Sequence, residues 1–590
     1  MNIIGISAFF HDASCCLIKN GKLISAAAEE RFSRIKHDPS IPRVAFQYCL
    51  EEGGINITEL DCIAYYEIPE LKLERQLSMG IFNTPRFCVE NMYHLDPNKP
   101  LDSIRDVLGF NGKVLKFSHH LSHAASAFYY SGFPESAILT VDGVGEWATT
   151  TYGRAIDSSI DLFEEVHYPH SLGLLYSAVT SYLGFSVNYG EYKVMGLAPY
   201  GELKYSHKFN QIIKIREKGQ YELDSEYFDF TNSKQMFTDK FVSLFGEIPR
   251  KRKSEITQFH KDVARSLQHT LEEILLKKIR YLHQQNPSDN LCLAGGVALN
   301  CVANGRIRRE GPFKNIFIQP AANDAGGALG AAALAHVAIT NKRPDQERLH
   351  HVYFGPSSSE KKIQSVLSAT GIDAIDYHNK EDILLTDIVE QLTSGAVVGW
   401  YKGRMEFGPR ALGARSIIAD PRRKEMRDRI NSLVKKRESF RPFAPVVLES
   451  HAHEHFDIYQ PSPFMLETCK VISSLDLPAI THINGSARVQ TITCNENPLF
   501  AALLEEFYKD TGCPILLNTS FNMSDEPIVN TPEDALICFA RSKMDVLVIE
   551  NYVVYKESLS DIWRDKLVRH YYRKSLLRRA PVSHDVYTFF

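Results

Sequence analysis

The sequence predicts an α/β protein with two sizeable domains, and three observations lead to this class. Short apolar segments typical of strands occur together with longer segments of helical periodicity. Near residue 340 the sequence becomes polar, and the stretch GPSSS at 355–359 is typical of a linker. The 590 residues, 44% of them hydrophobic, can form two large cores, although length alone would allow roughly three or four domains.

A strand, an acidic or glycine-rich loop and a second strand occur twice in the first 155 residues. The expected strands are 3–7, 15–18, 23–28, 137–141 and 148–152. Asn20 and Gly21 predict a two-residue hairpin turn, and Asp142 begins the turn DGVG after the fourth strand. This repetition is the pattern of an actin-like ATPase fold, in which two related halves hold a nucleotide.

Further elements follow from periodicity and from buried apolar segments. We expect helices at 119–130, around 263–275 and at 325–335, and strands at 291–294, 316–318 and 396–401. These elements predict a first domain at 1–355 and a second at 360–560, with an unassigned basic and aromatic tail at 561–590.

Two histidines four residues apart suggest a metal site. On a helix, His119 and His123 present both imidazoles on one face. Asp142 and Asp324 lie in turns after apolar strands, where carboxylates can complete the site. Two histidines with carboxylates suit Fe(II), Zn(II) or Mn(II). The histidine spacing alone is common, and the two acids are what favour a metal.

A nucleotide site is suggested by small and amide-bearing residues in the same domain. Gly295 and Gly296 allow a close approach of backbone amides to a phosphate or sugar. Asn300 and Asn323 can bind a nucleoside by hydrogen bonds, and Lys193 adds a positive charge near a compact turn. Tight packing of a helix on a strand is an equally good reading of the two glycines.

Several long motifs, in the correct order, resemble the NodU/CmcH carbamoyltransferase family over residues 1 to about 555. They are 10–14 (FHDAS), 119–126 (HHLSHAAS), 141–145 (VDGVG), 323–330 (NDAGGALG), 403–413 (GRMEFGPRALG), 440–445 (FRPFAP) and 517–522 (LNTSFN). The resemblance implies an actin-like, Kae1-like N-terminal domain and a YrdC-like C-terminal domain. It also implies that carbamoyl phosphate and ATP react to carbamoyladenylate in the second domain. The resemblance further implies that the carbamoyl group then passes to a hydroxyl of a small molecule in the first domain, and that this molecule is a secondary metabolite in natural-product biosynthesis.

The resemblance also implies which residues act. The metal ligands would be His119, His123, Asp142 and Asp324, with Fe(II) as the metal, and Mg²⁺ would accompany ATP. His11 matches a histidine near the transfer centre, and Arg410 is expected near the passage between the sites. The activation site would contain Arg441, Arg488, Asn518, Ser520 and one lysine. This lysine is either Lys435 or Lys436, and because the two are adjacent the motif does not distinguish them.

This chemistry explains why such residues are needed. Carbamate is a poor electrophile, and joining it to AMP supplies a leaving group. Bringing two phosphorylated reactants together favours a basic cluster, because guanidinium groups match phosphate oxygens. The basic stretch at 402–441 fits this need, and a solvated surface is its alternative interpretation. A hydroxyl must also lose a proton, and we hypothesise that His11 is the general base, although it can equally be a structural turn residue.

Bulk composition excludes several classes of protein. The formal net charge of −4 and a pI of about 6.6 do not favour a nucleic-acid or membrane partner. No apolar stretch reaches the ~20 residues of a membrane helix, and scattered cysteines favour a reduced cytoplasmic protein. The expected partners are ATP, carbamoyl phosphate and a hydroxylated small molecule. A homodimer is one oligomeric state that the sequence allows.

Three alternatives remain at this point. A Kae1/YrdC-type enzyme would threonylcarbamoylate tRNA and depend on threonine and bicarbonate. An actin-like sugar kinase would release ADP instead of AMP. A nucleotide-binding regulator would have no activity, although the metal-type and phosphate-type residues argue against lost catalysis.

Overall fold

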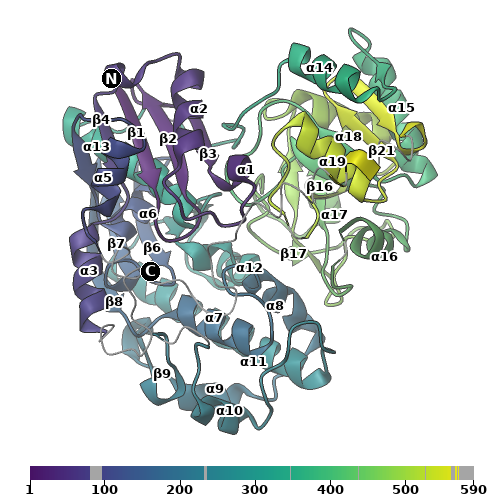
Figure 1. The fold of residues 1–590 in the computed structure, drawn as a ribbon. Coiled ribbons are helices and arrows are strands. Elements are labelled where there is room, and N and C mark those ends of the chain that lie inside the picture. Colours follow the sequence, from purple (N-terminus) through teal and green to yellow (C-terminus); the bar gives the residue numbers. More distant parts are fainter. Residues whose placement is uncertain are drawn as a thin grey trace. The chain divides into compact units, whose positions relative to one another are not determined.

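The computed structural model describes residues 1–79, 96–231, 235–345, 347–435, 437–524, 526–559, 565–567 and 569 (Figure 1). The described chain forms two compact units. Unit 1 contains Met1–Ser33 and His37–Leu349, and unit 2 contains Arg34–Lys36 and the described residues from His350 onward. Most of the unassigned tail at 561–590 lies outside the described residues.

The first half of unit 1 is a five-stranded sheet with the order β3-β2-β1-β4-β5. Its strands are β1 (Asn2–Ser7), β2 (Ser14–Lys19), β3 (Lys22–Ala28), β4 (Cys62–Tyr65) and β5 (Val114–Lys116). β2 pairs antiparallel with β1 and β3, whereas β4 pairs in parallel with β1 and β5. Asn20 and Gly21 both have positive φ, at 51° and 84°, as a tight hairpin of this type requires. The three predicted strands and their turn are confirmed.

The second half of unit 1 repeats this topology. Its strands are β6 (Glu135–Val141), β7 (Ala148–Ile156), β8 (Ser159–His167), β11 (Asn290–Ala294) and β12 (Asn315–Ile318). The order β8-β7-β6-β11-β12 again places two antiparallel pairings on one side of the first strand and two parallel ones on the other. The internal repeat is therefore a real structural repeat, and the actin-like α/β class predicted for the first domain is confirmed.

Two central helices pack tightly because small residues line their contacts. They are α6 (His119–Phe128) and α13 (Asp324–Thr340). A Cβ at Gly330 would lie 1.7 Å from the carbonyl oxygen of Ser122, and one at Gly5 would lie 1.9 Å from that of Ala328. Larger residues at either position would push α13 away from α6 or from β1. The residues between helices α6 and α13 are thus placed with little tolerance.

Unit 1 contains ten further described α-helices. They are α1 (Glu30–Ser33), α2 (Arg43–Gly53), α3 (Pro69–Ser78), α5 (Lys99–Asp106), α7 (Leu172–Tyr182), α8 (Glu191–Leu197), α9 (Ser206–Ile212), α10 (Asp239–Phe245), α11 (Gln258–Gln285) and α12 (Cys301–Glu310). Two short strands, β9 (Ile213–Ile215) and β10 (Tyr221–Leu223), form a separate pair. The predicted apolar face of α11 is buried, including Val263, Leu267 and Leu271.

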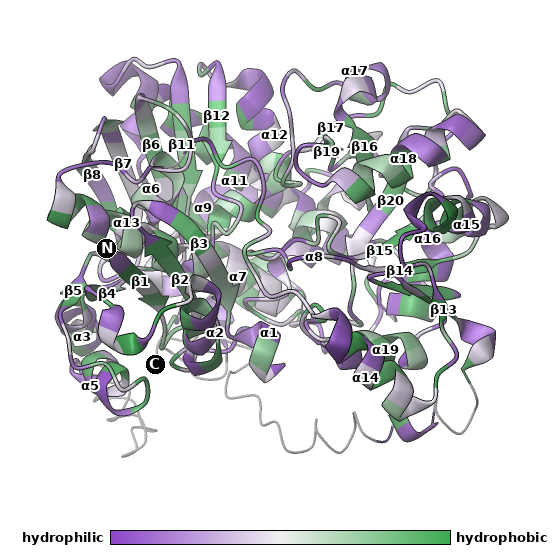
Figure 2. Cartoon of the chain, turned by 90° about the horizontal axis from the view of Figure 1, so that it is seen from above, coloured by the Kyte–Doolittle hydropathy of each residue, from purple (hydrophilic) through white to green (hydrophobic). Residues whose placement is uncertain are grey.

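Unit 2 is built around one eight-stranded mixed sheet with the order β13-β22-β21-β14-β15-β20-β16-β19. The strands are β13 (Ile375–Asp376), β14 (Val398–Tyr401), β15 (Arg415–Ala419), β16 (Ala444–Leu448), β19 (Gln490–Ile492), β20 (Ile515–Ser520), β21 (Val546–Ile549) and β22 (Tyr552–Tyr555). Apolar residues concentrate on the strands of each unit (Figure 2). The strand predicted at 396–401 is β14, and the second domain is α/β as predicted.

The described α-helices of unit 2 are α14 (Glu360–Thr370), α15 (Glu381–Ser394), α16 (Met426–Arg429), α17 (Ala452–His455), α18 (Pro498–Thr511) and α19 (Pro532–Arg541). Two short strands, β17 (Cys469–Lys470) and β18 (Ser486–Ala487), form a separate antiparallel pair. The basic stretch at 402–441 comprises a long loop, β15, α16 and the π-helix Ile430–Lys435. It is therefore not a single surface helix. None of the described helices combines the length and apolarity that crossing a bilayer requires.

A buried lysine on α11 provides a first testable prediction. Lys278 is fully buried, and its Nζ lies 4.9 Å and 4.7 Å from the ring centres of Tyr152 and Tyr221. Burial lowers the pKa of Lys278 to about 7. Between that pH and about 10.5 the unfolded chain binds the extra proton, so stability should rise with pH in this window. Urea unfolding between pH 7 and 9 should show this rise in the wild type and a flatter profile in Lys278→Met. Equal slopes would contradict it.

Candidate active sites

Four buried side chains of unit 1 converge at one point. α6 carries His119 and His123, whose Nε2 atoms lie 3.0 Å apart. The Oδ2 atom of Asp142, at the end of β6, lies 3.0 Å and 3.1 Å from these nitrogens. Oδ1 of Asp324, at the start of α13, lies 3.8 Å and 3.7 Å from them. The structure therefore brings together all four residues that were predicted as metal ligands.

The donor set fits a divalent cation. Two imidazole nitrogens that face each other across 3.0 Å need either a shared hydrogen or a cation between them. One ligand atom from each of the four side chains lies within 4.8 Å of the others. The Nε2 atoms face each other and Asp142, so Nε2 is the atom available to a ligand. The Nδ1 atoms of both histidines are buried and make no hydrogen bond among the described residues. Two histidines and two carboxylates suit Fe(II), Zn(II) or Mn(II).

The electrostatics of this cluster also favour positive charge. Burial lowers the pKa of His123, but hydrogen bonds to Asp142 and Asp324 outweigh it and raise the pKa to about 9. Burial raises the pKa of Asp142, yet its contacts with His119 and His123 hold it well below the usual range. Without a cation the cluster therefore retains a proton, and a metal ion would displace that proton on binding.

Backbone amides orient Asp142. Its Oδ1 atom accepts hydrogen bonds from the N–H groups of Gly143 at 2.8 Å and Gly296 at 3.0 Å, which turns Oδ2 toward the histidines. A Cβ on Gly296 would lie 2.9 Å from Oδ1, and Gly295 adopts a φ of 87°. The two glycines that were predicted to approach a nucleotide are thus also needed to hold a metal-type carboxylate.

Sequence reasoning missed Glu146, which supports the same helix. Its Oε1 accepts the backbone N–H groups of His119 at 2.9 Å and Ile68 at 2.8 Å, and its Oε2 accepts that of His119 at 3.1 Å. The N-cap residue Ser118 makes no side-chain cap bond, so Glu146 takes that role from another loop. Its place directly after the turn DGVG was the available signal in the sequence.

We expect Glu146→Gln to loosen the start of α6. The variant keeps the size of the side chain but replaces one acceptor oxygen by an NH2 group. This donor then faces backbone N–H groups, so at least one hydrogen bond is lost. The free energy of unfolding should fall by about 1–2 kcal/mol, and affinity for a divalent metal should fall about tenfold. Urea unfolding and metal titration measure both quantities. Glu165→Gln, on the exposed strand β8, is a matched control, and equal behaviour of the two variants would contradict the cap.

His11 lies beside the metal-type cluster. Its Nδ1 atom is 3.0 Å from Oδ2 of Asp12 and 3.9 Å from Oδ2 of Asp324. Burial lowers the pKa of His11, but the charges of Asp324 and the hydrogen bond to Asp12 outweigh it and raise the pKa to about 10. The structure thus places His11 near the predicted transfer centre, and its role as a base remains a hypothesis.

The remaining nucleotide-type residues of unit 1 are more dispersed. Asn300 is the N-cap of α12, and its amide exchanges hydrogen bonds with Gln268 at 2.9 Å and 3.0 Å. Asn323 is the N-cap of α13, and its Oδ1 is buried without a partner among the described residues. Lys193 lies on α8 with Nζ 5.2 Å from the ring centre of Tyr189. Nucleotide binding by these residues remains a prediction, and Asn300 also has a structural role.

A second buried polar site lies in unit 2. Strand β20 carries Asn518 and Ser520, two residues apart and therefore on one face. Lys435 Nζ donates to the carbonyl oxygen and Oγ of Ser520 at 2.7 Å and 3.2 Å. It also donates to the carbonyl oxygen and Oδ1 of Asn522 at 2.8 Å and 2.7 Å. Lys435 is therefore the lysine placed beside Ser520, whereas Lys436 lies outside the described residues.

Positive charge surrounds this lysine. Burial, followed by the nearby charge of Arg437 and with a further contribution from Arg441, lowers the pKa of Lys435 well below its usual value. Arg441 makes a long ion pair with Glu438 at 3.6 Å, and Oδ1 of Asn518 is buried without a partner in the described structure. Excess positive charge in a buried site is relieved by an anion such as a phosphate. Arg488, between β18 and β19, is half-buried.

The loop that carries Arg410 is organised by a residue that was not predicted. Glu406 is buried, and its Oε1 accepts the backbone N–H groups of Leu412, Ala414 and Arg415 at 2.7–3.2 Å. The half-buried Arg410 lies between β14 and β15 in this loop. Nothing in the described contacts tests its predicted role.

Comparisons with known proteins connect both units to one activity. The family model described as "Carbamoyltransferase N-terminus" matches residues 2–333, and "Carbamoyltransferase C-terminus" matches residues 389–556. The chain belongs to the carbamoyltransferase family. It is therefore a carbamoyl-transferring enzyme, as the sequence motifs predicted.

Similar proteins include two that the match covers over most of their length. The uncharacterized protein sll1178 of Synechocystis is 44% identical, with 94% of this chain and 97% of that protein covered. Nodulation protein NolNO of Sinorhizobium fredii is 40% identical, over 94% of this carbamoyltransferase and 80% of the relative. Among solved structures, HypF of T. kodakarensis matches with 14% identity, covering 58% of this chain and 48% of that one. The TM-score of this match is 0.32.

Proposed function

We propose that this carbamoyltransferase activates carbamoyl phosphate with ATP in unit 2 and transfers the carbamoyl group to a hydroxyl of a small molecule in unit 1. The observation that carries this proposal is the convergence of His119, His123, Asp142 and Asp324 at one buried point in a chain with carbamoyltransferase motifs. A second supporting observation is the cationic site around Lys435, Ser520 and Asn522 in the other unit.

The first reaction would take place in unit 2, with Mg²⁺ accompanying ATP. Water would hydrolyse carbamoyl phosphate to carbamate and phosphate, and a carbamate oxygen would then attack the α-phosphorus of ATP. This step forms carbamoyladenylate and releases pyrophosphate. Lys435 and Arg441 would neutralise charge on the phosphorylated reactants, while Asn518 and Ser520 offer hydrogen bonds to the carbamoyl group. Arg488 would add positive charge to this activation site. Arg410 is proposed to act near the passage of the intermediate between the sites.

The second reaction would take place in unit 1. His11 takes the proton from the acceptor hydroxyl while the new O–C bond forms and the C–O bond to AMP breaks. The products are the carbamate ester and AMP. A divalent metal held by His119, His123, Asp142 and Asp324, proposed to be Fe(II), would supply Lewis-acid stabilisation of negative charge. Asn323, Lys193 and the turn at Gly295 and Gly296 are the proposed contacts of the nucleotide part.

The test is incubation of the full chain with ATP, carbamoyl phosphate, Mg²⁺ and Fe(II) in the presence of a panel of hydroxylated metabolites. Formation of AMP and pyrophosphate that depends on carbamoyl phosphate, with a mass gain of one carbamoyl group on an acceptor, is expected. ATP consumption that is the same with and without carbamoyl phosphate would overturn the proposal.

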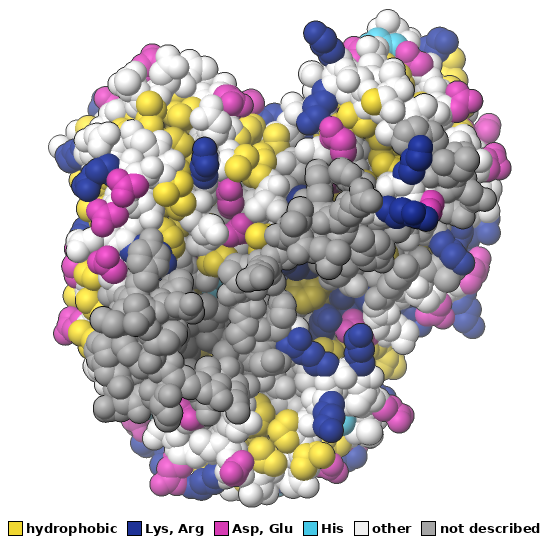
Figure 3. Space-filling model, in the orientation of Figure 1, with side chains coloured by type: hydrophobic (Ala, Val, Ile, Leu, Met, Phe, Trp, Pro, Cys, Tyr) yellow, Lys and Arg dark blue, Asp and Glu magenta, His cyan; other side chains and the backbone are white. Residues whose placement is uncertain are grey.

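The same assay separates the alternatives. A tRNA-modifying enzyme would need threonine and bicarbonate, and a sugar kinase would release ADP. On the face drawn in Figure 3, Lys and Arg side chains are interspersed with Asp and Glu, whereas nucleic-acid binding favours a continuous basic surface. The mixed charge and the net charge of −4 therefore favour a small-molecule acceptor.

A further inference from the structure

A chain of hydrogen bonds extends from His11 away from the metal-type cluster. Nδ1 of His11 lies 3.0 Å from Oδ2 of Asp12, and Nδ1 of His37 lies 2.7 Å from Oδ1 of the same carboxylate. Asp12 and His11 are buried, and His37 is half-buried. Each oxygen of one carboxylate therefore contacts the Nδ1 atom of a different histidine.

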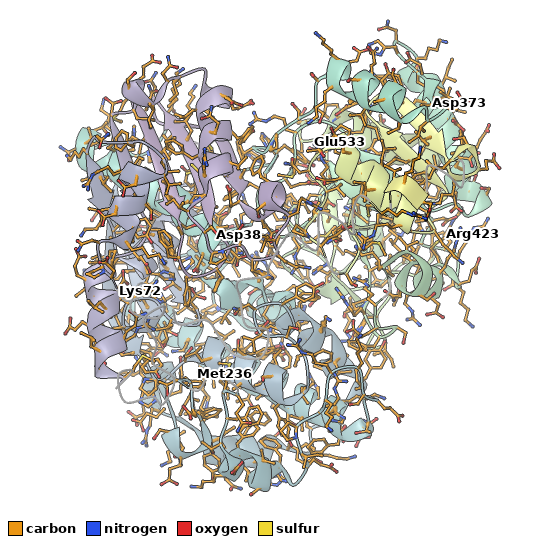
Figure 4. The ribbon with its side chains drawn as sticks, viewed as in Figure 1. Asp38, Lys72, Met236, Asp373, Arg423 and Glu533 are labelled. Carbon is orange, nitrogen blue, oxygen red and sulfur yellow. The ribbon has the colours of Figure 1, made fainter. Side chains whose placement is uncertain are left out.

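The two loops that carry these residues are fastened to each other. The N–H of Phe9 donates to the carbonyl oxygen of Pro39 at 2.7 Å, and that of Ala13 donates to the carbonyl oxygen of Asp38 at 2.9 Å. Asp38, which belongs to unit 1, is labelled in Figure 4. These backbone bonds hold the His37 loop against the His11 loop, independently of the side-chain bonds.

Both Asp12 and His37 adopt the left-handed backbone conformation, with a φ of 54° at each. This conformation is uncommon for residues other than glycine, although Asn, Asp and His adopt it more readily than most. The backbone therefore adopts a less favourable conformation at Asp12 and at His37, the two residues joined by the 2.7 Å hydrogen bond. The N–H of His37 also donates to Oε2 of Glu30 at 3.0 Å, which further restrains the ring.

We propose that Asp12 and His37 position His11 for carbamoyl transfer. An ionised carboxylate only accepts hydrogen bonds, so each Nδ1 that contacts Asp12 carries the hydrogen. When the His11 ring is neutral, this contact holds it in the tautomer whose Nε2 has a lone pair. That nitrogen can accept the proton of the acceptor hydroxyl. The inference rests on the proposed role of His11 as the base.

The contribution of His37 is to hold the carboxylate. With both oxygens engaged, rotation of the Asp12 carboxylate would break two hydrogen bonds instead of one. Burial raises the pKa of Asp12, but His37 and His11 outweigh it and keep the pKa well below its usual value, which fits a permanently ionised acceptor. A base oriented by a third group is a general arrangement in nucleophilic and acid–base catalysis.

A cation bound by Asp12, Glu30 and His37 is the competing interpretation, because their ligand atoms lie within 4.8 Å of one another. The hydrogen bonds account for this cluster without an ion. Both oxygens of Asp12 contact histidine Nδ1 atoms, and Oε2 of Glu30 accepts the N–H of His37. The test therefore includes metal stoichiometry as an outcome.

Two substitutions at His37 distinguish its side chain from its backbone. Glycine and asparagine both tolerate a φ of 54°, but only the asparagine amide can donate a hydrogen bond to Oδ1 of Asp12. We expect His37→Gly to lower kcat for acceptor carbamoylation about 10–100-fold with little change in the KM for the acceptor. His37→Asn should retain kcat within a few-fold. Both should keep the metal content and the pyrophosphate exchange that depends on carbamoyl phosphate.

Equal kcat in His37→Gly and the wild type would overturn the inference, as would equal losses in the glycine and asparagine variants. Loss of a second bound metal ion in His37→Gly would favour the cation interpretation and also overturn it. If His37→Gly does not fold, Asp12→Asn tests the same inference. The asparagine amide places an N–H donor opposite the Nδ1–H of one histidine, so kcat should fall at least as much as in His37→Gly. An active His11→Ala enzyme would instead refute the proposed base. An inactive His11→Ala beside a fully active His37→Gly would refute only the positioning role.

Discussion

Replacement of His123 by alanine should abolish carbamoyl transfer, with kcat falling at least ~10³-fold. The Nε2 atom of His123 lies 3.0 Å from that of His119 and 3.1 Å from Asp142. Its removal leaves one imidazole and two carboxylates, which should weaken metal binding and change the geometry of the site. Formation of carbamoyladenylate should continue, because that reaction is assigned to the other unit. Metal content per chain, acceptor carbamoylation and pyrophosphate exchange measure the three quantities separately.

His120 supplies a matched control on the same helix. It is equally buried, but its Nδ1 contacts Oγ1 of Thr140 at 2.6 Å and its Nε2 contacts the carbonyl oxygen of Ala148 at 2.8 Å. His120→Gln should therefore lower stability and keep the metal. If His123→Ala retains stoichiometric metal and normal transfer, the assignment of the metal centre is wrong.

The substitution with the second-largest expected effect is Lys435→Met, which should lower carbamoyl-phosphate-dependent pyrophosphate exchange about 10²–10³-fold. Lys435 Nζ is the buried amino group between Ser520 and Asn522, and methionine keeps much of its length without the hydrogen-bond donors. Lys424→Met, an exposed change in the same basic stretch, is the matched control and should retain activity. Similar exchange rates in the two variants would contradict the role of Lys435.

The stability of Lys435→Met provides an independent check. Because burial and neighbouring cations hold the pKa of Lys435 well below its usual value, the unfolded chain binds one more proton than the folded chain between the two pKa values. The free energy of unfolding contributed by this site should therefore rise with pH in that window, and the rise should be absent in Lys435→Met. A variant that loses activity while losing this pH dependence cannot be explained by general unfolding.

The sequence predicted the metal-type cluster in full because its signals are local. His119 and His123 share a helix face at a spacing of four, and Asp142 and Asp324 follow buried strands. In contrast, Gly296 was predicted to contact a nucleotide, which stays a prediction, and the contact that the structure shows is a hydrogen bond from its N–H to Asp142. Two strands distant in sequence must pair before such a contact exists, and no local pattern encodes it.

Other parts of the sites depend on contacts between distant residues. His37 lies 25 residues after Asp12, and their hydrogen bond depends on unusual backbone angles at both positions. Glu146 reaches α6 from a loop, and Glu406 holds backbone groups that lie six to nine residues away. Carboxylates of this kind resemble any other acid in the sequence, so their function appears only when their partners are known.

By itself, the sequence determined the α/β class, the duplicated strand pattern, the family and the residue types that this chemistry requires. These properties depend on local periodicity, on turn residues and on contiguous motifs. Only the tertiary structure decided that Lys435 is beside Ser520, that Asp142 is held by two amides, and that Asp12 joins two histidines. The physical reason is that hydrogen bonds and charge interactions act over a few ångströms in space, and chain folding alone sets which distant groups come within that range.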